Sequence, residues 1–249
     1  MYYIIIPFRE NPKEQRNIHK KYFIENTVPL LKKCLIKVKI IFIIQEPGAP
    51  FNRGALINIA VKLINSNPED IFFTHDVDVN PYENTIVKYY KPFINNKCIQ
   101  GIYTSAWDTL GGIIKFKKQD FIDINGFSNM FWGWGGEDTD LQNRATFNNI
   151  WIQKNLTNRP GDGENWFKIF NHPRNKESVK NNIKKYFLHQ YPRFSKNKVE
   201  KYIKTNGLTT VNYSVKSDVI EEYIRHILVS IPYEPDNINK YLENLKKMK

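Results

Sequence analysis

The sequence lacks the features of disulfide-rich, membrane-spanning and repetitive proteins. Cys34 and Cys98 are its only cysteines among 249 residues, too few for a disulfide framework, and we expect them to be small buried hydrophobes. No stretch approaches the roughly 20 apolar residues that cross a bilayer, and residues 1–7 are predicted to form a short strand rather than a signal peptide. Since neither repeats nor a clear linker occur, we expect one sizeable domain.

Acidic residues are fewer than basic ones, and the net charge of +12 raises a nucleic-acid hypothesis. Much of the excess lies in residues 168–204, which contain eleven lysines and arginines against two glutamates. Such a patch could attract an acidic acceptor, a membrane surface or nucleic acid, but a solvated lysine-rich face is the commoner explanation. An abundance of Asn, Ile and Lys also follows from a nucleotide-biased genome, so we do not expect a nucleic-acid partner.

Apolar patterning predicts an α/β fold. Residues 2–6 and 38–44 are β-branched runs typical of strands, and the amphipathic helical segment between them is interrupted near Pro29. Residues 53–64 have helical spacing, and a strand that runs into Asp78 follows. The remaining predictions are strands over 99–103 and 112–116, helices over 118–124 and 138–147, and a mobile loop over 158–164.

Two carboxylates separated by one residue follow a buried apolar run. Alternation at a strand end would turn Asp76 and Asp78 to the same side, where like charges repel unless a cation lies between them. Hard oxygen ligands favour Mg²⁺ or Mn²⁺, which typically completes its shell with substrate phosphates and water. An isolated Asp-x-Asp is more often an N-cap or Asx turn, but the preceding strand, at whose carboxyl end ligands bind in α/β sheets, favours a metal and diphosphate site.

Residues 132–140 read Trp-Gly-Trp-Gly-Gly-Glu-Asp-Thr-Asp and combine indoles, glycines and acids. Trp132 and Trp134 offer flat faces on which a sugar ring can stack, and the glycines let the backbone approach a ligand closely. The acids can supply a base. A plainer alternative is a glycine-rich turn before a helix with an acid-rich first turn. The second acidic motif upstream favours an active site.

With these motifs in this order, the chain resembles the β-1,4-galactosyltransferase family. The matching segments are residues 5–9, 51–53, 76–78, 125–127, 131–140 and 143–144. The resemblance implies an A-type glycosyltransferase fold, an α/β architecture with a Rossmann-like central mixed sheet flanked by helices. It implies a catalytic core over residues 1–176, followed by a basic, helix-rich extension over residues 177–249 that packs on the same domain.

The resemblance also implies a reaction, the inverting transfer of a hexose from a UDP-sugar to a carbohydrate or glycan hydroxyl. Asp138 corresponds to the catalytic base and Glu137 to an acid beside the donor sugar, while Asp78 and His172 correspond to ligands of Mn²⁺ or Mg²⁺. The donor positions are Pro7, Phe8, Arg9, Phe51, Asn52, Arg53, Asp76, Val77, Asp78, Trp134, Gly135 and Gly136. The acceptor positions are Trp134, Asp138 and Thr139. A loop near residues 155–180 is expected to close over the donor.

Departures from the family pattern leave the substrate open. Thr139 stands where a second Asp usually helps to hold the acceptor, and Thr109 lies where galactose-specific relatives often have Tyr, so UDP-GalNAc rivals UDP-Gal. Ile169 occupies the usual place of a Met metal ligand. Arg9 and Arg53 suit a diphosphate, with structural ion pairing as the alternative.

Two further alternatives concern activity and location. A sugar-nucleotide or carbohydrate-binding protein that keeps the fold without turnover is the alternative to an enzyme, although the intact acids argue against it. Because secretory members of the family usually carry a membrane anchor, a chain without one is expected to be cytoplasmic or to have lost its anchor.

Overall fold

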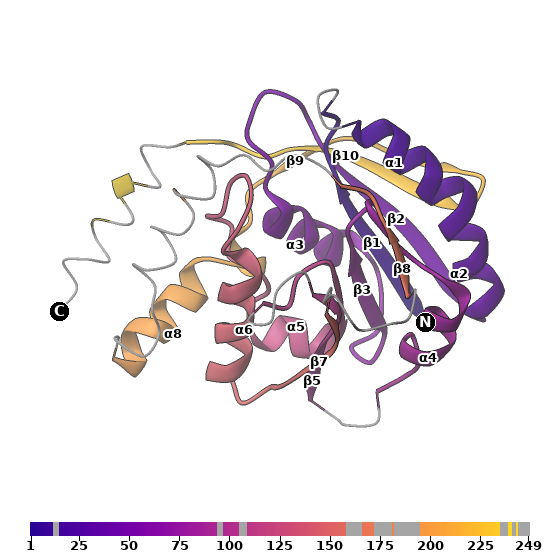
Figure 1. The fold of residues 1–249 in the computed structure, drawn as a ribbon. Helices are drawn as coiled ribbons and strands as arrows, with labels where there is room; N and C mark the ends of the chain where they lie inside the picture. Colours follow the sequence, from indigo (N-terminus) through magenta and orange to yellow (C-terminus); the bar gives the residue numbers. More distant parts are fainter. Residues whose placement is uncertain are drawn as a thin grey trace.

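A computed structural model of the protein describes residues 1–11, 15–93, 97–104, 109–157, 166–171, 181, 195–234, 239–240 and 243. At its centre is an eight-stranded mixed sheet in the order β7-β5-β6-β3-β1-β2-β10-β9 (Figure 1). The strands are β1 (Tyr2–Phe8), β2 (Val38–Gln45), β3 (Ile71–His75), β5 (Cys98–Thr104), β6 (Ile113–Lys117), β7 (Trp151–Thr157), β9 (Ser214–Glu221) and β10 (Ile224–Ser230). The predicted alternation of strands and helices is confirmed.

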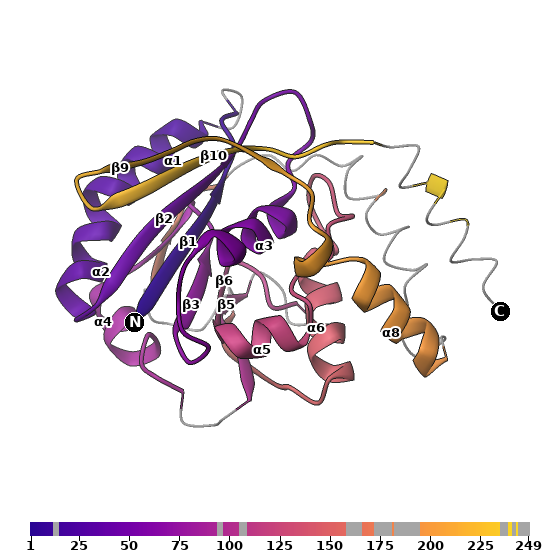
Figure 2. The same ribbon diagram turned by 180° about the vertical axis from the view of Figure 1, so that it is seen from behind.

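Helices cover both faces of this sheet (Figures 1 and 2). One face carries α1 (Arg16–Tyr22), α2 (Val28–Cys34) and α4 (Glu83–Tyr89), and the other carries α3 (Arg53–Leu63), α5 (Lys118–Asp123) and α6 (Glu137–Phe147). Other described elements are α8 (Lys196–Thr205), the 3₁₀ turn η4 (Leu208–Thr210), and the paired strands β4 (Val79–Pro81) and β8 (Phe167–Ile169).

The strand β1 explains why both faces are covered. Its apolar run is continuous, which is typical of a parallel strand buried on both sides. Ile4 and Ile6 join the core beneath α2 and α4, whereas Tyr3 and Ile5 join the core beneath α3 and α5. β1 pairs in parallel with both β2 and β3. The carboxyl ends of these strands therefore lie at one edge, where the sequence predicted the site.

The helical segment between β1 and β2 takes an unexpected form. It runs from Arg16 to Cys34 but becomes a π-helix, η2, over Phe23–Thr27. Pro29 follows at the start of α2 and has no backbone N–H to donate to the preceding turn. The predicted interruption near Pro29 is thus a widened turn just before it.

Two C-terminal strands were not predicted. β10 pairs in parallel with β2, and its Ile227 and Val229 are fully buried in the core. β9 pairs with β10 at the sheet edge and is exposed along its length. The segment predicted as a helix-rich extension contains α8 but also extends the central sheet. A division near residue 176 stays a prediction.

Other expectations from composition can be compared with the described residues. No helix among them is long and apolar enough to cross a bilayer. Cys98 is buried and Cys34 half-buried, and both thiols are free. The predicted loop over 158–164 and most of the basic segment lie outside the described residues.

Candidate active site

Three of the predicted segments meet beyond the carboxyl end of β3. Arg53, the first residue of α3, donates from Nε to Asp76 Oδ1 at 2.8 Å and from Nη1 to Asp138 Oδ1 at 3.0 Å. Asp76 directly follows β3, and Asp138 lies in the first turn of α6. One guanidinium therefore joins the two acidic motifs, which are far apart in the sequence.

Arg53 is an ion-pair partner of both aspartates, as the structural alternative expects, and its contact with a diphosphate stays a prediction. Burial lowers its pKa, but the charges of Asp76 and Asp138 outweigh burial and raise the pKa above its ordinary value. Its Nη2 is buried and has no hydrogen-bond partner among the described residues. One guanidinium nitrogen is thus left for a ligand such as a phosphate oxygen.

The two aspartates after β3 lie in a turn rather than in the strand itself. The turn is closed by the amide of Val79, which donates to the carbonyl of Asp76 at 3.1 Å. Burial raises the pKa of Asp76, Arg53 opposes this shift, and the charges of Asp78 and Asp138 add to it. Asp78 has a loose ion pair with Arg16, at 3.7 Å. Negative charge is therefore concentrated here.

His75 is the last residue of β3 and contacts this turn, and the sequence analysis did not identify it. Its Nε2 lies 2.9 Å from the hydroxyl of Tyr90, and its Nδ1 lies 3.2 Å from the carbonyl oxygen of Asp76. Burial lowers the pKa of His75 to about 4, so the ring is neutral and makes one donor and one acceptor contact. His75 thus positions the acidic turn without carrying charge.

The glycine-rich segment forms a turn that only glycine suits well. Gly135 and Gly136 have φ values of 100° and 96°, in the left-handed region. Among the described residues no atom lies within 4 Å of where a Cβ on Gly135 would stand, so that part of the structure leaves room for a ligand there. Gly136 is the N-cap of α6 and directs the first turn of that helix toward Arg53.

The two tryptophans of this segment differ. Trp134 is 39% exposed, whereas Trp132 is only 6% exposed and its ring centroid lies 4.7 Å from that of Tyr233. The prediction of a sugar-stacking face is therefore wrong for Trp132, which packs inside the fold. It stays open for Trp134.

Glu137 and Asp138 are adjacent but have unlike surroundings. Glu137 is buried, and its Oε2 has no hydrogen-bond partner among the described residues. Burial, followed by the charge of Asp138, raises the pKa of Glu137 to about 8. Asp138 is ion-paired with Arg53, and its side chain is 19% exposed. The pair therefore offers a neutral acid that can donate a hydrogen bond and a carboxylate that can accept a proton.

Several predicted donor positions are core residues in this structure. Pro7 and Phe8 lie at the buried end of β1, and Val77 packs in the core beneath α4. Asn52 is fully buried and caps α3, since its Oδ1 accepts from the amide of Ala55 at 2.9 Å. These residues position the edge of the site, and their direct contact with a donor stays a prediction.

Arg9 and Phe51 lie nearer the surface, and both are half-buried. Arg9 donates to the carbonyl of Ala49, and its guanidinium carbon lies 6.0 Å from the centroid of the Phe51 ring. Phe51 in turn accepts from the amide of Gly133 at 2.6 Å through its carbonyl oxygen. The nucleotide-binding motif and the glycine-rich turn are therefore in contact.

The predicted metal ligands can be followed only in part, because His172 lies outside the described residues. β8 pairs with β4, and the amide of Phe170 donates to the carbonyl of Asp78 at 2.9 Å. Ile169 is partly buried and packs against the apolar core. In the described part of the chain no three His, Cys, Asp or Glu side chains form a group that could hold a metal ion.

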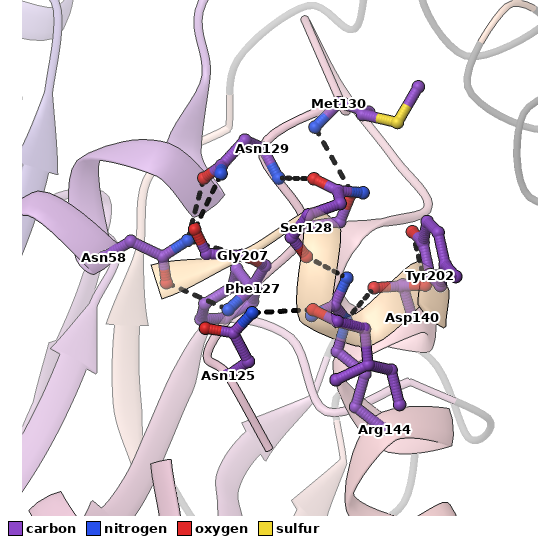
Figure 3. A network of polar contacts seen from close by, with 12 residues as sticks. Asn58, Asn125, Phe127, Ser128, Asn129, Met130, Asp140, Arg144, Tyr202 and Gly207 are labelled. Atoms are coloured by element: carbon purple, nitrogen blue, oxygen red, sulfur yellow. Dashed lines mark hydrogen bonds and ion pairs between the residues drawn. The ribbon is translucent and has the colours of Figure 1, made fainter. Parts of the chain in front are cut away.

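A buried network of polar contacts joins α6 to the C-terminal segment (Figure 3). Arg144 donates from Nε to Asp140 Oδ2 at 2.6 Å, and both side chains are fully buried on α6. Tyr202 of α8 donates to Asp140 Oδ1 at 3.1 Å, and Arg144 Nη2 donates to the carbonyl of Asn206 at 2.7 Å. The C-terminal segment therefore holds the helix that carries Glu137 and Asp138.

Asparagines extend this network to the loop before the turn (Figure 3). Asn58 of α3 accepts from the amide of Phe127 at 2.9 Å, and Asn125 donates to the carbonyl of Ile203 at 2.6 Å. Asn129 donates to the carbonyl of Gly207 at 2.8 Å. The sequence analysis missed these bridging roles because asparagine is abundant throughout the chain.

Comparisons with known proteins agree with this arrangement. The family model described as the N-terminal region of glycosyl transferase group 7 matches residues 2–91, and the model described as the N-terminal domain of galactosyltransferase matches residues 98–161. Human β-1,4-galactosyltransferase 4 is 29% identical over 220 residues, which are 86% of this chain and 58% of that protein. Bovine β-1,4-galactosyltransferase 1 is 31% identical over 183 residues, 72% of this chain and 43% of that protein. The chain thus spans less than two thirds of these relatives.

A solved structure extends the likeness to the fold. A mutant of Drosophila β-1,4-galactosyltransferase 7, in complex with manganese, UDP-Gal and xylobiose, has a TM-score of 0.66 and 17% identity. The match covers 96% of this chain and 97% of that one. It confirms the predicted A-type glycosyltransferase fold.

Proposed function

The chain belongs to the β-1,4-galactosyltransferase family, and on that premise we propose that it is a metal-dependent inverting glycosyltransferase. It moves Gal or GalNAc from a UDP-sugar to a hydroxyl of a carbohydrate or glycan acceptor. The observation that carries this proposal is the convergence of Asp76 and Asp138 on Arg53 beyond β3, with Glu137 adjacent. A binding protein would have little use for a carboxylate and a neutral acid side by side at such a point.

Asp138 serves as the base. In a single displacement the acceptor oxygen bonds to the anomeric carbon, the bond from that carbon to the diphosphate breaks, and the hydroxyl proton passes to the Asp138 carboxylate. Its partial exposure and its place on the first turn of α6 suit this role. Neutral Glu137 donates a hydrogen bond to the donor sugar, and the exposed ring of Trp134 packs against the sugars.

Asp78 and His172 are the residues that would hold Mn²⁺ or Mg²⁺. Among the described residues Asp76, Asp78 and Asp138 share only two arginines, and this excess of carboxylates fits a divalent cation, as does the oxygen chemistry of Asp78. The backbone bond between Phe170 and Asp78 supports the pairing with His172, two residues farther on. When bound, such an ion offsets the charge of the departing diphosphate.

The donor sugar and the acceptor depend on two threonines. Thr109 is half-buried beside Leu110 and is smaller than the Tyr of galactose-specific relatives, which leaves room for an N-acetyl group. Thr139 follows Asp138 on α6 and contributes a hydroxyl where a second carboxylate would hold the acceptor. We propose UDP-Gal and UDP-GalNAc as the two donors to compare.

The test is UDP release from UDP-Gal and UDP-GalNAc, with acceptors ending in N-acetylglucosamine or xylose. Turnover is expected with Mn²⁺ or Mg²⁺ and is expected to stop with a chelator. Asp78→Asn should raise the metal concentration needed for half-maximal rate. Tight UDP binding without turnover of any donor would overturn the enzyme and favour the inactive sugar-nucleotide-binding protein. Size-exclusion chromatography of the same protein gives its oligomeric state.

A further inference from the structure

A cavity of about 390 Å³ opens on the α4 side of the sheet, and none of its lining residues belongs to the candidate active site. Its floor consists of neighbouring side chains on three strands, with Gln100 paired with Lys115 on one side and with Gln153 on the other. Residues at the end of α4 and just after it form the wall. The lining residues are Lys88, Tyr89, Lys91, Pro92, Phe93, Cys98, Gln100, Lys115 and Gln153, which we call the lysine pocket.

Lys115 is a buried cation without an acidic partner. It is 3% exposed, and its Nζ donates to the carbonyls of Lys91 at 2.9 Å and Tyr89 at 3.2 Å. The ring of Phe93 lies 4.5 Å from the same Nζ. Among the described residues no carboxylate pairs with it, although buried charges are normally paired. Burial lowers its pKa to about 8, so these contacts do not fully replace water.

Two further lysines stand at the mouth of the lysine pocket. The side chains of Lys88 and Lys91 are exposed, and Lys88 Nζ lies 4.6 Å from the ring centroid of Trp166. No aspartate or glutamate occurs among the lining residues described here. Three positive charges therefore surround the pocket, and an anion entering it gains attraction from each.

Gln100 adds a hydrogen-bond acceptor without a donor partner among the described residues, on the floor of the lysine pocket. It is 7% exposed, and its Oε1 is buried without a hydrogen-bond partner in the described part of the structure. A buried acceptor without a partner is unfavourable, and a ligand hydroxyl would satisfy it. The rings of Tyr89 and Phe93 supply an apolar wall beside it. The volume lies within the range of small-molecule pockets.

We propose that the lysine pocket binds a small anionic sugar. Its phosphate or carboxylate lies against Lys115, Lys88 and Lys91, and one of its hydroxyls donates to Gln100 Oε1. The proposal rests on the pocket alone and does not depend on the transferase activity.

The test is calorimetric titration of the full chain with glucose 6-phosphate and, separately, with glucuronate, each in the absence and in the presence of saturating UDP and Mn²⁺. At least one of the two is expected to bind at a single saturable site, and the stronger ligand identifies the anionic group. Neutral glucose is expected not to bind. Lys115→Met should weaken binding at least tenfold, whereas Lys37→Gln, which removes an exposed charge elsewhere, should leave it unchanged.

Two more variants keep the test decisive if Lys115→Met does not fold. Lys91→Gln changes an exposed side chain and should weaken binding a few-fold, and Gln100→Leu should weaken the sugar but not inorganic phosphate. Circular dichroism checks that each variant is folded. The proposal is overturned if neither anionic sugar binds, if UDP displaces it, or if folded Lys91→Gln and Gln100→Leu both bind like the native chain.

Discussion

Asp138 and Asp140 lie two residues apart on α6 but in opposite situations. Asp140 is fully buried, and both of its oxygens are engaged, by Arg144 and by Tyr202. Asp138 shares Arg53 with Asp76 and is partly open, next to an unpartnered oxygen of Glu137. A buried acid whose oxygens are all hydrogen-bonded within the fold stabilises the structure. Acids that share too few cationic partners within the fold can instead bind a ligand.

Replacing the arginine of each region with methionine is expected to have the largest effect and tests this comparison most strongly. Arg144→Met leaves Asp140 buried without its guanidinium, and should lower the free energy of unfolding by about 3–5 kcal/mol. Arg53→Met should cost less than about 2 kcal/mol, because the side chains of Asp76 and Asp138 are 31% and 19% exposed and water can reach them. Urea unfolding of both variants measures the difference. Equal costs would contradict the distinction.

A pH series isolates Glu137. Its pKa is raised from 4.5 to about 8 in the folded chain, so the neutral form stabilises the fold fully below about pH 4.5. The free energy of unfolding falls as the pH rises from about 4.5 to about 8, by up to about 1.4 kcal/mol per pH unit for one proton, and the contribution is lost above pH 8. Glu137→Gln should remove this slope between pH 5 and 8, whereas Glu222→Gln, at an exposed position, should keep it. Parallel curves for Glu137→Gln and the native chain would refute the shift.

The smallest effect tests one bond of the buried network. Tyr202→Phe removes the hydroxyl that donates to Asp140, and should cost about 1.5–3 kcal/mol because the acceptor is charged. Tyr213→Phe is the matched control, since that half-buried ring packs against the core without a hydroxyl hydrogen bond among the described residues. Thermal unfolding of the pair should separate them. A loss no larger for Tyr202 than for Tyr213 would remove this bond from the account.

Local patterns predicted much of the fold. The apolar runs at β1 and β2 and the helical spacing of α3 agree with the structure to within about two residues, because each pattern reports burial along its own segment. The same reasoning missed β9, which is exposed throughout and carries no burial pattern. It also missed β10, whose place inside the sheet depends on pairing with β2, far earlier in the chain.

The candidate site was predicted in its parts but not in its connections. Asp76 and Asp138 were found from their motifs, whereas their sharing of Arg53 depends on three segments meeting in space. The burial of Trp132 against Tyr233 could not be read from the motif either, because that contact joins residues about a hundred positions apart in the chain. Residue types indicated the chemistry, and tertiary packing decided which side chains remain available.

The most direct test of the central claim is transfer by Asp138→Asn. With UDP-Gal or UDP-GalNAc, Mn²⁺ and an acceptor, the rate should fall by about 10²–10⁴, the usual contribution of a general base. UDP binding, measured by calorimetry, should stay close to that of the native chain, because the substitution keeps the size of the side chain. Undiminished transfer by a folded Asp138→Asn variant would remove Asp138 as the base and contradict the account.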